Sequence, residues 1–105
     1  MYLPDHKTIY NRLKQSAKKR GINFTLTSTD ILHLDLPITC PILGIPLQYN
    51  TGTMEDNSYS IDRIDSSRGY EPDNIQVISL KANRAKNNLT EKELQLMSKY
   101  YSIPS

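Results

Sequence analysis

Residues 60–88 read SIDRIDSSRGYEPDNIQVISLKANRAKNN, and the pattern within them changes three times. The alternation that starts at Tyr59 (YSIDRI) is typical of a half-buried strand. The run DSSRGYEPDN is rich in turn formers and predicts a loop, in which Gly69 can take a φ above zero. The β-branched run IQVIS from Ile75 predicts a second strand, and LKANRAKNN from Leu80 favours a helix. We therefore expect strand, loop, strand and helix in this order.

A basic helix is predicted ahead of this stretch. Apolar residues recur there at four-residue spacing: Ile9, Leu13 and Ala17. Asp5 is a candidate N-cap, and Gly21 is a candidate C-cap after three cations. Residues 5–20 carry six basic side chains and one acidic one, so this segment is far more cationic than the whole chain. Taken alone, a solvated helix face explains this charge as well as a phosphate partner does.

The segment between this helix and the polar stretch has weaker signals. Residues 22–27 (INFTLT) alternate and predict a short strand that leads to a turn at STD, and a short helix is expected over residues 31–34. Residues 40–49 (CPILGIPLQY) favour a tight loop and an edge strand, because Pro and Gly stand among apolar residues. Four apolar residues of this run are expected in the core: Ile42, Leu43, Ile45 and Leu47.

A last helix is predicted near the end of the chain. Thr90 and Glu93 form a T-x-x-E capping box at its start. Leu94 and Met97 are expected to face inward, with Tyr101 as a further candidate.

Length and composition set the outer limits. A chain of 105 residues predicts a single domain over residues 1–105. The predicted strands and helices place this domain in the α+β class. The net charge of +2 permits a nucleic-acid partner without requiring one. One cysteine excludes an internal disulfide, and the first residues lack the apolar core of a signal peptide. Because no apolar run approaches the roughly 20 residues of a membrane-spanning helix, we expect no membrane partner and a cytoplasmic protein.

Residues 40–88 resemble an HNH nuclease of the His-Me finger, or ββα-metal, group. The motif residues DRID, GY, DN and AN, with a lysine three residues after the last Asn, follow in the order of that finger, in a DRID variant found among phage sequences. The resemblance implies a finger core over about residues 58–88, flanked by the basic N-terminal helix and a C-terminal helix. It implies that Asp62 and Asn83 bind one Mg²⁺ or Mn²⁺ ion. Asn74 would tether the loop by bonds to its backbone, and Lys86 would face a phosphate.

Many HNH proteins also brace the finger with zinc, held by two CxxC pairs. The matching positions here read Cys40, Leu43, Ser79 and Ala82. A tetrahedral zinc site needs four nitrogen or sulfur ligands, which one thiolate and two distant histidines do not supply. We therefore expect no structural zinc. Leu43 and Ala82 are expected to extend the apolar core, and Cys40 is expected to be a small buried apolar residue.

The sequence departs from the family at Arg63, where the general-base histidine is expected. An arginine stays protonated and cannot accept a proton from water at neutral pH, although it can bind a phosphate with two nitrogens. Three alternatives remain for activating water: a histidine from elsewhere, His33 or His6; the carboxylate of Asp65; or a metal-bound hydroxide without a dedicated base.

The resemblance implies a divalent-metal-dependent DNA endonuclease or nickase in a bacterial or phage-infected cell. Its catalytic residues would be Asp62, Arg63 and Asn83. The basic residues expected to contact DNA are Arg63, Arg68, Arg84, Lys86, Lys18, Lys19 and Arg20. An alternative is a weak or inactive finger that binds nucleic acid or a host protein as a regulator, and a homodimer stays open. A plainer interpretation treats the Asp and Asn residues only as caps and turn formers.

Overall fold

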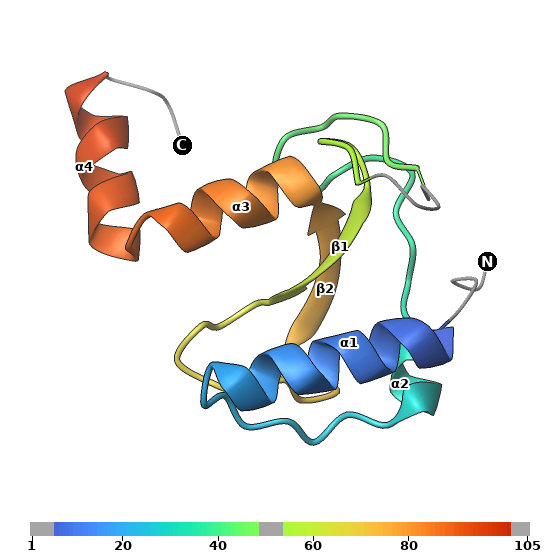
Figure 1. Ribbon diagram of the computed structural model, residues 1–105. Helices are drawn as coiled ribbons and strands as arrows, with labels where there is room; N and C mark the ends of the chain where they lie inside the picture. Colours follow the sequence, from blue (N-terminus) through green and yellow to red (C-terminus); the bar gives the residue numbers. More distant parts are fainter. Residues whose placement is uncertain (1–5, 49–53, 102–105) are drawn as a thin grey trace.

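A computed structural model describes residues 6–48 and 54–101 of the chain. The elements follow in the order α1 (His6–Lys19), α2 (Ser28–Leu32), β1 (Tyr59–Arg63), β2 (Ile75–Ser79), α3 (Leu80–Asn88) and α4 (Glu91–Tyr100). The predicted α+β class is confirmed, since N-terminal helices precede a β-hairpin and further helices follow it in a ββα-like arrangement (Figure 1). The predicted order of strand, loop, strand and helix over residues 59–88 is confirmed as well.

The hairpin pairs β1 with β2 in antiparallel register. Asp62 stands opposite Gln76, and Ser60 stands opposite Ile78. Because side chains alternate along a strand and paired residues share a face, Ser60, Asp62 and Gln76 lie on the same face of the sheet. The register thus places the polar residues of β1 beside those of β2.

Two small clusters of buried residues hold these elements together. The first joins α1, α2 and the hairpin loop: Ala17, Leu26, Ile31 and Tyr70. The second lies between residues 40–47, β2 and α3: Cys40, Leu47, Val77, Ile78 and Ala82. Figure 1 shows α1 crossing the loop end of the hairpin, with α2 against α1 and α3 leaving from the opposite end. The hairpin is therefore supported from two sides.

Helix α1 ends as its sequence predicts. Gly21 has a φ of 67°, and the amide of Ile22 donates to the Ala17 carbonyl at 2.9 Å. The Gly21 amide donates to the Lys18 carbonyl at 3.2 Å, which completes a Schellman motif. The candidate C-cap is thus confirmed, and the candidate N-cap Asp5 lies outside the described residues.

The strand predicted over residues 22–27 is wrong. The structure has only one isolated bridge there, Phe24 with Tyr70, with backbone bonds on either side of it. The pairing stops because α2 begins at Ser28, four residues on, where Thr27 and Asp30 form a capping box. The STD segment therefore starts a helix rather than a turn, and the short helix lies earlier than predicted.

The hairpin loop keeps its glycine for a different reason from the one expected. Gly69 is not among the positive-φ glycines of the described residues, which are Gly21 and Gly44. A Cβ at Gly69 would instead lie 2.5 Å from the carbonyl oxygen of Asn23. The loop needs a glycine here because another part of the backbone passes against it.

Residues 40–48 form a tight loop, and the predicted edge strand is reduced to isolated bridges. Leu47 is buried and Ile45 is partly buried, as expected. Ile42 and Leu43 are exposed, so the prediction that they join the core is wrong. The turn closes from the Gly44 amide to the Cys40 carbonyl at 2.8 Å, which turns the side chains at its tip toward solvent.

Helix α4 has the predicted capping box, but its apolar residues are not buried. Thr90 and Glu93 exchange side-chain bonds with each other's backbone amides at 3.1 and 2.8 Å. Leu94, Met97 and Tyr101 are all exposed, so the inward-facing prediction is wrong. The extended backbone at Leu89 turns the chain away from α3, and α4 stands off the rest of the molecule (Figure 1).

Candidate metal and phosphate site

Asp62 is a buried carboxylate on the face of β1 that α3 covers. It is 5% exposed, and both of its oxygens have a partner. The Lys86 ammonium donates to Oδ1 at 2.8 Å, and the Gln76 amide donates to Oδ2 at 3.1 Å. A buried charge requires such partners, since removing it from water is costly.

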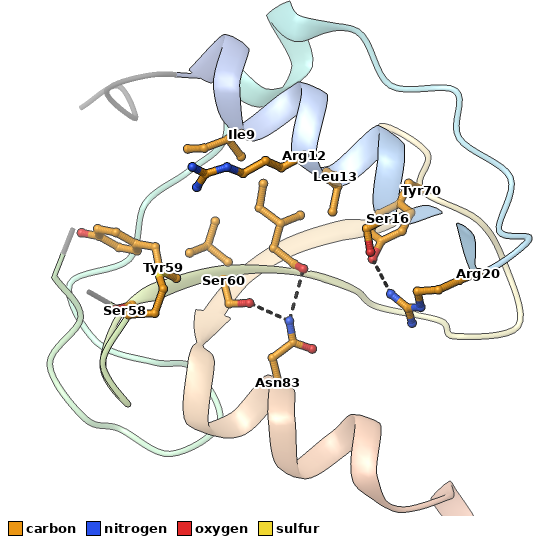
Figure 2. A pocket seen from close by; sticks show the side chains of 13 residues that line it. Ile9, Arg12, Leu13, Ser16, Arg20, Ser58, Tyr59, Ser60, Tyr70 and Asn83 are labelled. Atoms are coloured by element: carbon orange, nitrogen blue, oxygen red, sulfur yellow. Dashed lines mark hydrogen bonds between the residues drawn. The ribbon is translucent and has the colours of Figure 1, made fainter. Parts of the chain in front are cut away.

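Asn83 comes from the first turns of α3 and reaches β1 from below, as Figure 2 shows. Its Nδ2 donates to the Ser60 hydroxyl at 2.6 Å and to the Ile61 carbonyl at 3.4 Å. Its Oδ1 accepts from Asn87 at 3.3 Å. Because Lys86 and Asn87 follow Asn83 by three and four residues, all three lie on one face of the helix.

This helix face also satisfies the free edge of the hairpin. In an antiparallel ladder, alternate residues direct their backbone groups away from the partner strand, and Ile61 and Arg63 do so here. Asn83 reaches the Ile61 carbonyl, and the Lys86 ammonium reaches the Arg63 carbonyl at 2.6 Å. The residues expected to bind metal and phosphate therefore also have a structural role at this edge.

Arg63 is held by the hairpin loop. One guanidinium nitrogen donates to the carbonyls of Ser66 and Arg68, both at 2.9 Å, and the guanidinium lies 5.6 Å from the centre of the Tyr70 ring. These contacts fix the position of the side chain that directly follows Asp62. Both of these hydrogen bonds are donated by Nη1.

Asp62 and Asn83, which are 21 residues apart in the chain, line one small pocket of about 40 Å³. The other described residues around it are Arg20, Arg63, Ser66, Tyr70, Lys86 and Asn87. Three of the basic residues expected to contact DNA, Arg20, Arg63 and Lys86, thus line the same pocket as the two expected metal ligands. Arg20 is positioned there by a 3.4 Å bond to the Tyr70 hydroxyl.

Other predicted DNA contacts lie elsewhere. Arg68 is paired with Glu71 and Asp73, each at 2.9 Å, and the hydrogen bond that Arg68 donates to Asp73 raises the pKa of Arg68. Its charge is therefore balanced within the loop. Lys18 and Lys19 are exposed in the last turn of α1, and Arg84 is exposed on α3, none of them in the pocket.

The loop itself is built around Asn74. This side chain is 1% exposed and accepts from the Asp65 amide at 2.8 Å. Its Nδ2 donates to the Asp65 carbonyl at 3.0 Å and to the Gly69 carbonyl at 2.8 Å. The expected tether between the Asn74 side chain and the loop backbone is present.

The structure disfavours the side chains considered as a general base in place of the family's histidine. Asp65 accepts from the Ser67 hydroxyl at 2.6 Å and the Ser67 amide at 2.9 Å, and the hydroxyl bond is the main reason its pKa is lowered. A carboxylate with a lowered pKa is a weak base. His6 begins α1 and His33 ends α2, and among the described residues neither lines the pocket.

The four positions that hold zinc in many HNH proteins lie together. The Cys40 sulfur accepts from the amides of Leu43 at 3.4 Å and Ser79 at 3.3 Å, and the Ser79 hydroxyl accepts from the Ala82 amide at 3.1 Å. Burial raises the pKa of the Cys40 thiol, but hydrogen bonds from Ser79 and neighbouring amides outweigh it and lower that pKa to about 7. Cys40 and Ala82 are buried, as expected.

The oxygen donors of the small pocket fit a hard divalent cation. Asp62 offers a carboxylate and Asn83 an amide oxygen, and Mg²⁺ is commonly held by one or two carboxylates with water and phosphate. Lys86 binds one Asp62 oxygen, and its side chain is 28% exposed. In residues 6–48 and 54–101, no three His, Cys, Asp or Glu side chains are grouped to hold a metal. These donors suit an ion bound mainly by water and substrate.

Sequence reasoning missed several residues in and around the pocket. Gln76 could have been found from the antiparallel register, which sets it opposite Asp62. Asn87 could have been found from its four-residue spacing to Asn83. Tyr70 is buried in the cluster with Ala17, and its hydroxyl also accepts from Arg20.

Comparison with known proteins finds no match: no family model, no curated protein and no solved structure is similar to the chain. The resemblance to HNH nucleases rests on the ordered motif residues alone. Within the described residues, no helix is long and apolar enough to cross a membrane.

Proposed function

We propose that the protein is a divalent-metal-dependent endonuclease or nickase that hydrolyses phosphodiester bonds in DNA, in the cytoplasm of a bacterial or phage-infected cell. One observation carries the proposal: a buried carboxylate, Asp62, shares a small pocket with an amide and three cationic side chains. This combination offers oxygen ligands to a cation and positive charge to a phosphate in the same place.

The proposed roles follow from the contacts. Asp62 and Asn83 would hold the ion, which would supply a water of lowered pKa and polarise the phosphate. Lys86 leaves the Asp62 oxygen and binds a phosphate oxygen instead, so the site exchanges an internal ion pair for one with substrate. Arg63 stays on its two loop carbonyls and directs its remaining N–H groups at the phosphate.

A protein-borne base is not part of this proposal. Asp65 has a lowered pKa and is committed to Ser67, and the histidines of the described residues lie outside the pocket. Arg63 stabilises developing negative charge but takes no proton. Activity is therefore expected to depend on the ion for water activation and to rise with pH through neutrality.

The test is a supercoiled-plasmid nicking assay with Mg²⁺ or Mn²⁺. Asp62→Ala and Asn83→Ala are expected to lose at least about 100-fold in rate, as removing a group that stabilises the transition state does. Asp35→Ala is the matched control, because Asp35 is an exposed aspartate outside the small pocket, and it is expected to cleave like wild type. Metal-dependent nicking that survives Asp62→Ala would overturn the assignment.

A second candidate function is a finger that binds nucleic acid, or a host protein, without cutting. It is favoured by the Lys86–Asp62 ion pair and by the two carbonyls that hold Arg63, which satisfy these charged groups without any ligand. DNA binding by wild type with no cleavage in either metal, across supercoiled, linear and single-stranded substrates, would support this candidate over the enzyme.

A further inference from the structure

A second cavity lies between α1 and β1, and it adjoins the small pocket. Its volume is about 350 Å³, within the range of sites that take a small organic group. Three residues line both hollows: Arg20, Tyr70 and Asn83. An extended ligand with a phosphate in the small pocket can therefore continue into the larger cavity.

The wall that α1 contributes to this cavity has two rows of side chains. Ile9 and Leu13 form an apolar row, and Arg12, Ser16 and Arg20 form a polar row, each at four-residue spacing. Figure 2 shows the arginines toward opposite ends of the cleft, with Ser16 between them. Eight residues of helix span about 12 Å, so the two guanidinium groups can engage different phosphates of one strand.

The opposite wall of the cavity is formed by apolar side chains together with a few polar ones. Ile61 and Val77 of the hairpin face Ile9 and Leu13, and the Ser60 hydroxyl lies beside them. Helix α1 has no acidic side chain between His6 and Lys19, so nothing on it offsets the two arginines. Apolar walls, a few hydroxyls and flanking cations fit an anionic ligand with a flat apolar body.

We propose that this cleft binds one unpaired nucleotide of a DNA strand, next to the phosphate held in the small pocket. The inference rests on the proposed function and deepens it by naming the substrate as a single-stranded, mismatched or locally opened site. An unpaired base has free apolar faces that can slide between aliphatic side chains, whereas the bases of an intact duplex are stacked away from them. The arginines would hold the phosphates on either side.

The experiment measures binding without metal, so that no strand is cut. Fluorescein-labelled single-stranded octanucleotide, its blunt duplex, and the duplex with a one-base bulge are titrated with protein in EDTA and followed by anisotropy. We expect the octanucleotide and the bulged duplex to bind at least about tenfold more tightly than the blunt duplex, as one stacked base provides.

Ser16→Phe tests the cleft directly. Ser16 is exposed, so the phenyl ring fills the mouth of the cleft without entering the core. It is expected to remove the preference for unpaired DNA, while Gln15→Phe, one residue along on the exposed surface and outside the cleft, is expected to keep it. Arg12→Ala is expected to reduce the salt slope of octanucleotide binding by about one.

The outcomes separate this inference from the nuclease proposal. Equal affinity for the blunt duplex and the octanucleotide, or a preference that Ser16→Phe leaves unchanged, overturns the cleft assignment even where plasmid is cut. A preference for unpaired DNA that Ser16→Phe abolishes supports the assignment, including in a protein that cuts nothing.

Discussion

The two sides of the hairpin are built in opposite ways. On the α3 side, the buried side chains Ile78 and Ala82 pack closely, and the polar residues of β1 are bonded to α3. On the α1 side, a cavity of about 350 Å³ separates the helix from the strand, and most of the residues that line it are half-buried or exposed. A closed side can hold a few reacting groups in fixed positions, whereas an open side can admit a ligand. Under the proposed function, the reacting groups would lie mainly on the α3 side and the space for substrate mainly on the α1 side, with Arg20, Tyr70 and Asn83 lining both hollows.

The largest expected effect tests this difference in packing. Ile78→Ala should lower the free energy of unfolding by about 4 kcal/mol, because the side chain is fully buried and its neighbours cannot close the gap. Leu13→Ala should cost only about 1 kcal/mol, because Leu13 is half-buried and already borders a cavity. Urea denaturation measures both. Equal losses would contradict the contrast between the two sides.

The next effect concerns the ion pair on the closed side. Lys86→Met should destabilise the protein by about 3 kcal/mol, because it leaves the buried Asp62 carboxylate without its cation. The double variant Lys86→Met with Asp62→Asn should recover most of this loss, since the charge is then gone. Thermal unfolding of these two variants, of Asp62→Asn alone and of the wild type completes a double-mutant cycle. A double variant as unstable as Lys86→Met would show that the ion pair is not the cause.

A pH effect should come from Cys40, which belongs to the closed side. Its pKa is lowered from 9.0 to about 7 in the folded protein. A lowered pKa means that the stabilising contribution is present above the unfolded value and is lost as pH falls through 7. Unfolding free energy should therefore drop by about 2 kcal/mol from pH 9 to pH 7. Cys40→Ser should flatten this dependence, and an unchanged slope in that variant would assign it to another group.

The smallest expected effect lies in α4, which belongs to neither side. Met97→Gln should change the free energy of unfolding by less than about 0.5 kcal/mol, because Met97 is 48% exposed on a helix without buried residues. Ala82→Gln on α3 is the contrasting variant and should be strongly destabilising, because Ala82 is 5% exposed. A large loss for Met97→Gln, measured at several protein concentrations, would reveal a contact made by α4.

The parts of the fold that the sequence predicts well are those with strong local signals. The strand alternation after Tyr59, the glycine after α1 and the capping box at Thr90 each act within a few residues, and all are present. The tether at Asn74 was expected from the family resemblance, and its bonds to the loop backbone are also local.

The errors arise where the outcome depends on distant parts of the chain. Residues 22–27 have strand composition, but within residues 6–48 and 54–101 their strand pairing is limited to one bridge with the loop at Tyr70. Ile42 and Leu94 have core composition, but both are exposed among the described residues. Sequence periodicity shows which face of an element is apolar, and it cannot show whether another element arrives to cover that face.

The same limit applies to the candidate site. Lys86 was expected to face a phosphate, yet it pairs with Asp62, 24 residues away, because the hairpin register and the helix phase bring them together. Arg20 follows Lys18 and Lys19 in the sequence, but it donates to the Tyr70 hydroxyl and lines the small pocket, whereas the two lysines do not line it. Which cations meet the carboxylate could be decided only in three dimensions.

Tyr70 makes the two halves of the chain interdependent. It lies in the hairpin loop, yet it is one of the four buried residues of the cluster that joins α1, α2 and this loop, and its backbone is bonded to Asn23 and Thr25. Excising residues 58–88 as a minimal finger would strip this ring of its surroundings and leave both fragments without a complete interior. We therefore expect the N-terminal helices and the finger to unfold in one cooperative transition.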